Sequence, residues 1–316
     1  MASDRQIIEE RISLPVTPMM TAGLHRFTPR NGEVKGTVLM LHGLMQGSDV
    51  FFDQVRGGGL AYYLAEKGYD VFVCQLRGRD ATNDQLKLEP FGLKQVLQED
   101  LPLIWSSVEK RCRHQDIYLV GYQFGSLLWS AMIARQPELL DKVRGILHFC
   151  PQRALIPGGK RKNFWYGFLE RSMMPKLGKL LGFVPSQRFK IGKKNESLPL
   201  YSDALQWRNG DWKDQWDGFD YLAAMEKLSL PPSLYFVTLK PSWRGLEHDC
   251  RAFMFELGHH NGRMIKLGSK VGNKANYARN ELCTHLKAEE DYFPLILEWM
   301  KEVLPQHQEA QVSIGC

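Results

Sequence analysis

Residues 119–130 read LVGYQFGSLLWS, and this stretch is the clearest indication of the architecture. Apolar residues run into Gly121, a second glycine follows at Gly125, and the chain then becomes apolar and helix-prone. A short apolar run that ends at a glycine is typical of a buried strand, and the helical pattern behind it predicts a sharp strand-to-helix turn. Gln123 stands at the tip of that turn.

Other apolar runs of the same kind alternate with helical stretches along the chain. Continuous apolar strands separated by helices are typical of a parallel sheet that is covered on both faces. The predicted strands are 37–43, 69–76, 116–121, 145–149, 233–239 and 263–268, and the predicted helices include 60–68, 101–110 and 293–304. The sequence therefore predicts an α/β fold with a mostly parallel central sheet.

Composition places the 316-residue chain among ordinary globular proteins, with 44% hydrophobic and 24% charged residues. The first fourteen residues, MASDRQIIEERISL, are charged throughout and lack the apolar segment of an export signal, which predicts a cytoplasmic location. Six cysteines are scattered without a CxxC pair, so we expect reduced thiols and neither a metal site nor a disulfide framework. No cofactor is implied.

The alternation of predicted strands and helices stops between His148 and Pro231. Roughly eighty residues intervene, and a segment of that length is too long for a loop without structure of its own. We interpret residues 150–230 as an inserted, mostly helical cap, and residues 1–149 and 231–316 as the core. Residues 153–194 contain eleven Lys or Arg and a single acid, Glu170. Aromatic residues recur within the same segment, at Phe164, Trp165, Tyr166 and Phe168.

Four segments carry a resemblance to a known family: LMLHGLMQGSDVF, LAYYLAEKGYDVFVCQLRGRD, LVGYQFGSLL and CTHLKAEEDYFPLILEW. Together they resemble the α/β-hydrolase superfamily, particularly its lipase and esterase branch, over about residues 35–302. In that family the strand-to-helix turn reads GxSxG, and the serine is the nucleophile. The resemblance implies the α/β-hydrolase fold and places Gln123 at the nucleophile position.

The resemblance also implies where the other parts of such a site would lie. The oxyanion hole would be formed by the backbone N–H groups of Leu44 and Phe124, with His42 and Gly43 shaping the first loop. The base would be His285, in a late loop before the last helix. The acid would follow the strand 233–239, but Pro241 or its neighbours stand there.

Two of the three triad positions are thus expected to be lost. A carboxamide has no ionisable proton, so Gln123 cannot become a nucleophile and no acyl-enzyme can form on it. Ser126 is three residues further on, inside the helix, where it is expected to pack or to bond a carbonyl group. Glu247 or Asp249 could replace the acid after a loop rearrangement, although solvation on a helix surface is the simpler expectation.

The remaining histidines have simpler interpretations. We expect His42 to be structural, and His259 and His260 to lie in an exposed turn. Within the predicted cap, residues 150–230, the aromatic side chains are expected to form its core. Its basic side chains are expected to form a solvated face.

Three classes of function remain open at this point. The first is a non-hydrolytic, hydrolase-derived protein that binds a hydrophobic or acyl-type molecule in the former active-site pocket. The second is a lyase, isomerase or atypical ester hydrolase that uses His285 as general base with a backbone oxyanion hole. The third is an interaction or scaffold protein. The basic cap would meet an anionic membrane surface or an acidic protein, and nucleic acid is the weakest candidate because no recognised motif accompanies the charge.

Overall fold

The structure is a computed structural model that describes residues 6–153, 167–240 and 247–303. Its strands are β1 (Ile7–Pro15), β2 (Thr21–Pro29), β3 (Thr37–Leu41), β4 (Asp70–Gln75), β5 (Ile117–Tyr122), β6 (Val143–Phe149), β7 (Phe183–Val184), β8 (Glu196–Ser197), β9 (Ser233–Thr238) and β10 (Gly262–Leu267). Its helices are α1 (Leu60–Glu66), α2 (Asn83–Leu88), α3 (Leu93–Gln95), α4 (Leu101–Glu109), α5 (Phe124–Arg135), α7 (Met174–Leu181), α8 (Leu198–Asn209), α9 (Tyr221–Met225), α10 (Glu247–Glu256), α11 (Ala288–Asp291) and α12 (Phe293–Glu302).

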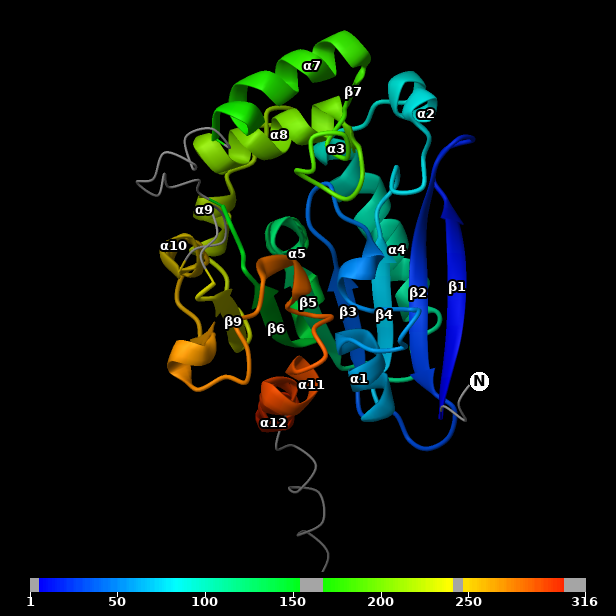
Figure 1. Cartoon of the computed structure of the whole chain (residues 1–316), viewed down its shortest axis with the longest axis vertical. Helices are drawn as coiled ribbons and strands as arrows, with labels where there is room; N and C mark the ends of the chain where they lie inside the picture. Colours follow the sequence, from blue (N-terminus) through cyan, green and yellow to red (C-terminus); the bar gives the residue numbers. More distant parts are fainter. Residues whose placement is uncertain (1–5, 154–166, 241–246, 304–316) are drawn as a thin grey trace, which may run out of the picture.

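Eight strands form one sheet in the order β1-β2-β4-β3-β5-β6-β9-β10 (Figure 1). The strands β4, β3, β5, β6, β9 and β10 pair in parallel with their neighbours in that order. Strand β2 is antiparallel to both β1 and β4. All six predicted strands and the three predicted helices are confirmed. The antiparallel pair β1 and β2 was not predicted, because most of β1 is exposed and its sequence has no continuous apolar run.

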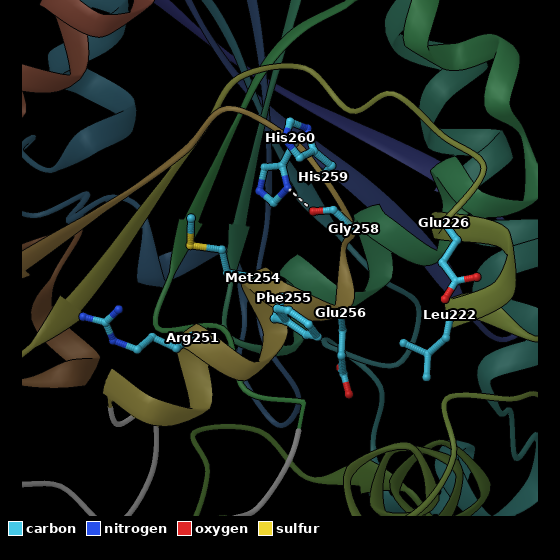
Figure 2. Close-up of a pocket in the computed structure, with 9 residues that line it drawn as sticks. All are labelled: Leu222, Glu226, Arg251, Met254, Phe255, Glu256, Gly258, His259 and His260. Carbon is cyan, nitrogen blue, oxygen red and sulfur yellow. Dashed lines mark hydrogen bonds between the residues drawn. The ribbon is translucent and has the colours of Figure 1, made fainter.

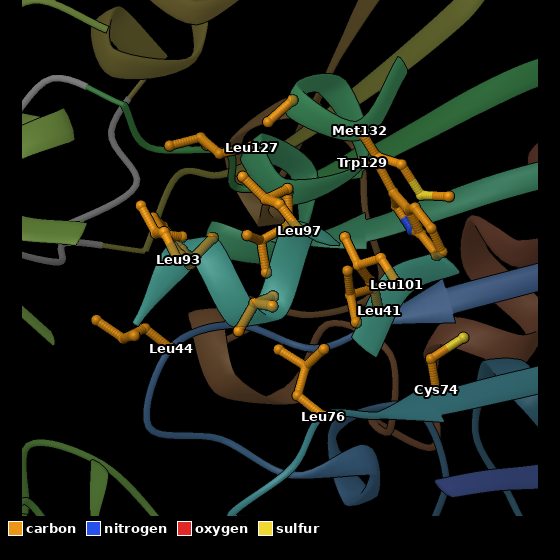
Figure 3. Close-up of a cluster of buried hydrophobic side chains, with 14 of the residues drawn as sticks. Leu41, Leu44, Cys74, Leu76, Leu93, Leu97, Leu101, Leu127, Trp129 and Met132 are labelled. Carbon is orange, nitrogen blue, oxygen red and sulfur yellow. The ribbon is translucent and has the colours of Figure 1, made fainter. Parts of the chain in front are cut away.

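The parallel strands are buried on both faces, and every residue of β3, β5 and β9 is buried. One apolar cluster joins the sheet to α4, α5 and α8, and the other joins it to α1 and α12. Figure 3 shows part of the first cluster, where Leu41 and Cys74 of the sheet face Leu101 and Trp129 of the helices. Leu44, which directly follows β3, also belongs to this cluster.

The residues between β6 and β9 form α7, α8 and α9, together with the small hairpin of β7 and β8. Figure 1 shows α7 and α8 side by side, at the opposite end of the molecule from α11 and α12. The inserted segment is attached to the core at Phe91, whose N–H donates to Ser197 Oγ at 2.9 Å. Phe164, Trp165 and Tyr166 lie outside the described residues, and the cap boundaries stay a prediction.

Candidate functional site

Gln123 lies between β5 and α5 with φ 52° and ψ −110°. A side chain other than glycine at positive φ costs about 1–3 kcal/mol, so the surrounding structure must hold this backbone in place. One restraint is the Gln123 N–H, which donates to the carbonyl oxygen of Phe149 in β6 at 2.8 Å. The chain therefore makes the sharp, strained turn at the residue where the sequence predicts it.

The glycines around this turn allow three backbone segments to approach closely. A Cβ at Gly121 would lie 2.4 Å from Ser126 Cα, and one at Gly125 would lie 2.1 Å from the Leu41 carbonyl oxygen. A Cβ at Gly43 would lie 3.1 Å from the Tyr122 carbonyl oxygen and 3.3 Å from Gln123 Cβ. The loop after β3 and the turn after β5 are therefore in direct contact, and a side chain at Gly121 or Gly125 would clash with backbone atoms.

Ser126 is fully buried, and its hydroxyl donates to the carbonyl oxygen of Gly121 at 2.9 Å. Its N–H donates to the Gln123 carbonyl oxygen at 3.2 Å. The hydroxyl thus bonds the backbone of the preceding strand, as expected for a serine in the first turn of a helix.

The side chain that meets Gln123 is Arg279, which the sequence interpretation missed. Arg279 Nη1 donates to Gln123 Oε1 at 3.3 Å, and Arg279 begins a short helical turn, Arg279–Glu281, between β10 and α11. The Arg279 carbonyl oxygen also accepts a hydrogen bond from the Tyr122 hydroxyl. Burial lowers the pKa of the Arg279 guanidinium, and the nearby charge of Arg208 acts in the same direction.

The Gln123 amide also lies beside Tyr122. Burial raises the pKa of the neighbouring Tyr122 phenol, and the Gln123 side chain lowers that pKa in part. Gln123 Nε2 itself is nevertheless without a hydrogen-bond partner among the residues that the structure describes. The Gln123 side chain as a whole is buried, and an unpaired buried amide is costly.

His285 makes its contacts elsewhere in the same loop. Its Nδ1 accepts from the Lys287 N–H at 3.2 Å, and its ring lies edge-on to the ring of Tyr277, with 4.9 Å between the centroids. Within residues 6–153, 167–240 and 247–303, no hydrogen bond or ring contact joins His285 to Gln123. The described side chain that hydrogen-bonds Gln123 is therefore Arg279, and the role of His285 as the base stays a prediction.

The position predicted for the acid, Pro241, lies outside the described residues. Glu247 is paired with Arg251 at 2.8 Å and with Lys266 at 2.9 Å, which lowers the pKa of its carboxyl group. Asp249 departs from the expected solvated position: it is 1% exposed and lies 3.1 Å from His248 Nε2. It is buried because it lies on the inner face of α10, beside buried Cys250.

The loop after β3 is held by side chains from the core and from the inserted segment. His42 is buried and donates from Nδ1 to the Gly43 carbonyl oxygen at 2.9 Å, while burial lowers its pKa to about 3. Met45 N–H donates to Glu196 Oε2 at 3.0 Å, and Glu196 is paired with Arg79 at 2.7 Å in the interior. His42 is structural, as expected. The assignment of an oxyanion hole to the amides of Leu44 and Phe124 stays a prediction.

A buried charged pair covers Phe124 on the side of the inserted segment. The Arg208 guanidinium carbon lies 5.6 Å from the centre of the Phe124 ring, and Arg208 Nη1 lies 3.3 Å from Glu170 Oε1. Burial lowers the pKa of Arg208 to about 10, although Tyr201 and Asp249 partly offset this effect. Trp207 completes this side, with its ring centroid 5.9 Å from that of Phe124.

Solved structures of esterases superimpose on nearly the whole chain. An esterase from Exiguobacterium antarcticum aligns with a TM-score of 0.57 and 14% identity, over 92% of this chain and 99% of that one. Esterase B from Lactobacillus rhamnosis aligns with a TM-score of 0.56 and 17% identity, over 98% of this chain and 90% of that one. The chain has the α/β-hydrolase fold. Identities this low show the fold alone.

Sequence comparison gives a similar but more local result. The chain is 25% identical to human Lipase member M over 143 residues, which is 42% of this chain and 34% of that protein. It is 25% identical to Lipase 3 of Drosophila melanogaster over 188 residues, or 53% of this chain and 46% of that protein. The match thus spans less than half the length of these curated relatives. No protein-family model matches the chain.

A separate hollow of about 830 Å³ lies between α9, α10 and the turn after α10 (Figure 2). His259 is exposed there, as predicted, but His260 is partly buried. His260 Nε2 lies 2.6 Å from the Tyr235 hydroxyl, and its Nδ1 bonds the Gly258 carbonyl oxygen at 2.9 Å. Its ring is therefore part of the packing against β9, which corrects the expectation of an exposed turn.

Two properties of the described chain bear on cofactors and membranes. No group of three or more His, Cys, Asp or Glu residues in it could hold a metal ion. None of its helices is both long and apolar enough to span a bilayer.

Proposed function

We propose that this protein binds an acyl-type or other hydrophobic small molecule at the position of a hydrolase active site, without hydrolysing it. The observation that carries this proposal is the buried Gln123 Nε2, which has no partner among the described residues. A carbonyl or carboxylate oxygen of a ligand would accept its proton and remove the cost of the unpaired amide.

The groups around Gln123 also support binding without covalent chemistry. An arginine is always protonated in proteins, so Arg279 cannot accept a proton as a histidine would. Ser126 uses its hydroxyl in a backbone hydrogen bond. Phe124 and Leu44 are both buried next to the turn, so the surroundings of the Gln123 amide are partly apolar.

The two alternative classes have less support. A general base needs an orienting partner, and His285 has no carboxylate within hydrogen-bond distance among the described residues. A scaffold protein with a closed pocket is disfavoured by the hollow of about 580 Å³ that Arg279 lines. Lipase is what the similar curated proteins are called, and their activity does not follow for this chain.

The test is binding of a fluorescent fatty acid, cis-parinaric acid, to wild-type protein and two variants. Gln123→Leu removes the amide at nearly constant volume, and we expect at least tenfold weaker binding, in line with ~1.5–3 kcal/mol for a hydrogen bond to a charged group. Gln115→Leu makes the same change at an exposed turn and should bind like wild type. Equal binding by all three proteins would contradict the proposal, as would rapid labelling of the wild type by a fluorophosphonate.

A further inference from the structure

A second feature of the Gln123 region is the hollow of about 580 Å³ that Arg279 lines. Its walls come from four separate segments: the loop after β3, the turn at residues 187–193, Lys240 just after β9, and residues 278–280. Arg279 lines the hollow and also donates to Gln123, so the hollow adjoins the strained turn.

The charged residues described in this lining are all cationic: Lys190, Lys193, Lys240 and Arg279. Lys193 has a partner, because its Nζ lies 2.9 Å from Asp49 Oδ2, but both side chains are about half exposed and such pairs are weak. Within the described parts of the chain, the other three cations form no ion pair. Like charges gathered in this way repel one another unless an anion lies between them.

The walls of the hollow are held firmly by backbone contacts. The N–H groups of Lys193 and Lys194 donate to the Met45 carbonyl oxygen at 2.9 and 3.0 Å. A Cβ at Gly192 would lie 2.4 Å from Met45 Cβ, so the turn at 187–193 presses directly on the loop after β3. Lys190 has φ 54°, an unfavourable conformation for a lysine that sets the direction of its side chain.

Neutral donors complement the cations. Gln46 Oε1 accepts from the Gly43 N–H at 3.2 Å, so its amide nitrogen is the end left to donate. Asn280 also lines the hollow, as does Gln187, whose Nε2 already donates to the Lys193 carbonyl oxygen at 2.7 Å. Cations together with neutral amides, and without carboxylates, match a ligand that has several acceptor oxygens and more than one negative charge.

We propose that this hollow binds the phosphate group of a small molecule, with Arg279 at the side of Gln123 and Lys190 and Lys240 around it. A phosphate monoester carries about −1.5 to −2 charge at pH 7 and three acceptor oxygens, which suits one arginine fork and two lysine point charges. A carboxylate carries a single negative charge and would leave more of the repulsion among the cations of the lining in place. Phosphate binding does not require the acyl-type ligand proposed above, although one molecule could carry both groups.

The test uses pyrophosphate and sn-glycerol 3-phosphate as probes in isothermal titration calorimetry. The double variant Lys190→Gln, Lys240→Gln should bind both at least ~tenfold more weakly, because each loses two charge-assisted contacts. Arg279→Gln should weaken binding further. The double variant Lys270→Gln, Lys301→Gln makes the same charge change at exposed positions outside the lining and should bind like wild type. Melting temperatures would show that all variants are folded.

A second arm identifies the source of the phosphate. Wild-type protein is mixed with phosphatidylcholine vesicles that contain either phosphatidic acid, which has a phosphate monoester, or phosphatidylglycerol, which has a diester. Binding of the soluble probes indicates a soluble ligand. Tighter binding to phosphatidic acid vesicles than to phosphatidylglycerol vesicles, without binding of the soluble probes, indicates a lipid. Either result supports the proposal if Lys190→Gln, Lys240→Gln reduces it. The proposal is overturned if no phosphate monoester binds, or if both double variants bind equally. Because pyrophosphate has no acyl chain, this outcome is independent of the parinaric acid experiment.

Discussion

At the scale of single residues, Gln123 and Arg279 occupy the centre of the candidate site as a pair. A carboxamide offers no proton to a base, and a guanidinium cannot accept one. In serine hydrolases these roles belong to a hydroxyl group and an imidazole. The side chains in contact at this turn therefore favour hydrogen bonding to a ligand over covalent chemistry.

This pairing predicts what would be needed to make the site reactive. Gln123→Ser alone should react very slowly with a fluorophosphonate, because Arg279 still stands beside residue 123. Adding Arg279→His supplies a base at that place, and the labelling rate should rise at least ~10²-fold, the lower end for general base catalysis. Mass spectrometry of the labelled peptide would measure both rates.

The matched control for that experiment is Gln123→Ser combined with His285→Ala. It should label as slowly as Gln123→Ser, since His285 contacts Tyr277 and Lys287. If His285→Ala instead removes the labelling and Arg279→His adds none, His285 is the base and the role given to Arg279 is wrong.

At the scale of elements, α7 carries a basic and partly apolar outer surface. Lys176 and Lys179 are exposed, and Leu180 beside them is 81% exposed. An exposed leucine beside lysines on a helix is suited to the surface of an anionic membrane, where each lysine contributes about 1 kcal/mol. The exposed surface of α7 is thus separate from the hollow near Gln123, which residues 187–193 line.

We expect wild-type protein to bind phosphatidylglycerol vesicles more weakly as salt rises through ~0.1–0.5 M, because salt screens exposed charges. Lys176→Glu, Lys179→Glu should weaken that binding at least ~tenfold, from about 1 kcal/mol for each lysine. Lys270→Glu, Lys301→Glu has the same net charge and should have a much smaller effect. Vesicle sedimentation measures all three proteins. Binding that is independent of salt, or equal loss in both variants, would rule out this role for α7.

At the scale of the whole molecule, two buried histidines make stability depend on pH. Burial lowers the pKa of His42 and of His148 from 6.5 to about 3. His148 lies between the rings of Tyr235 and Phe253, at 4.6 and 5.5 Å between centroids. Both side chains stay neutral in the folded protein but take up a proton in the unfolded chain below pH 6.5. The stability that the two neutral histidines contribute to the folded protein is therefore complete above pH 6.5 and is lost as the pH falls toward 3.

Each histidine should lower the free energy of unfolding by ~1.4 kcal/mol per pH unit in that range. His148→Phe keeps an aromatic ring and removes the titrating group. From pH 7 to pH 5.5, the free energy of unfolding measured with urea should therefore fall by about 1.3 kcal/mol less in this variant than in wild type. His259→Phe, at an exposed position, should show the pH dependence of wild type. Parallel curves for wild type and His148→Phe would mean that His148 is not buried as described.

The local sequence contains enough information for most of this architecture. Six strands and the turn at Gln123 follow from apolar runs and glycine positions, because a strand buried on both faces must be apolar throughout and a close backbone approach excludes a Cβ. The strand β1 was missed because its exposed residues lack that pattern. Its place depends on antiparallel pairing with β2, which is a contact between segments.

The composition of the site depends on contacts that are distant along the chain. Arg279 and His285 lie in one loop, and nothing in their local sequence distinguishes which of them reaches Gln123. The path of that loop is set by tertiary hydrogen bonds, such as those from Leu60 N–H to the Cys283 carbonyl oxygen and from Tyr122 to the Arg279 carbonyl oxygen. The burial of Asp249 and Arg208 likewise arises only when α8 and α10 pack on the core. Apolar periodicity is a property of one segment, whereas the position of a charged side chain depends on the partners that several segments bring together.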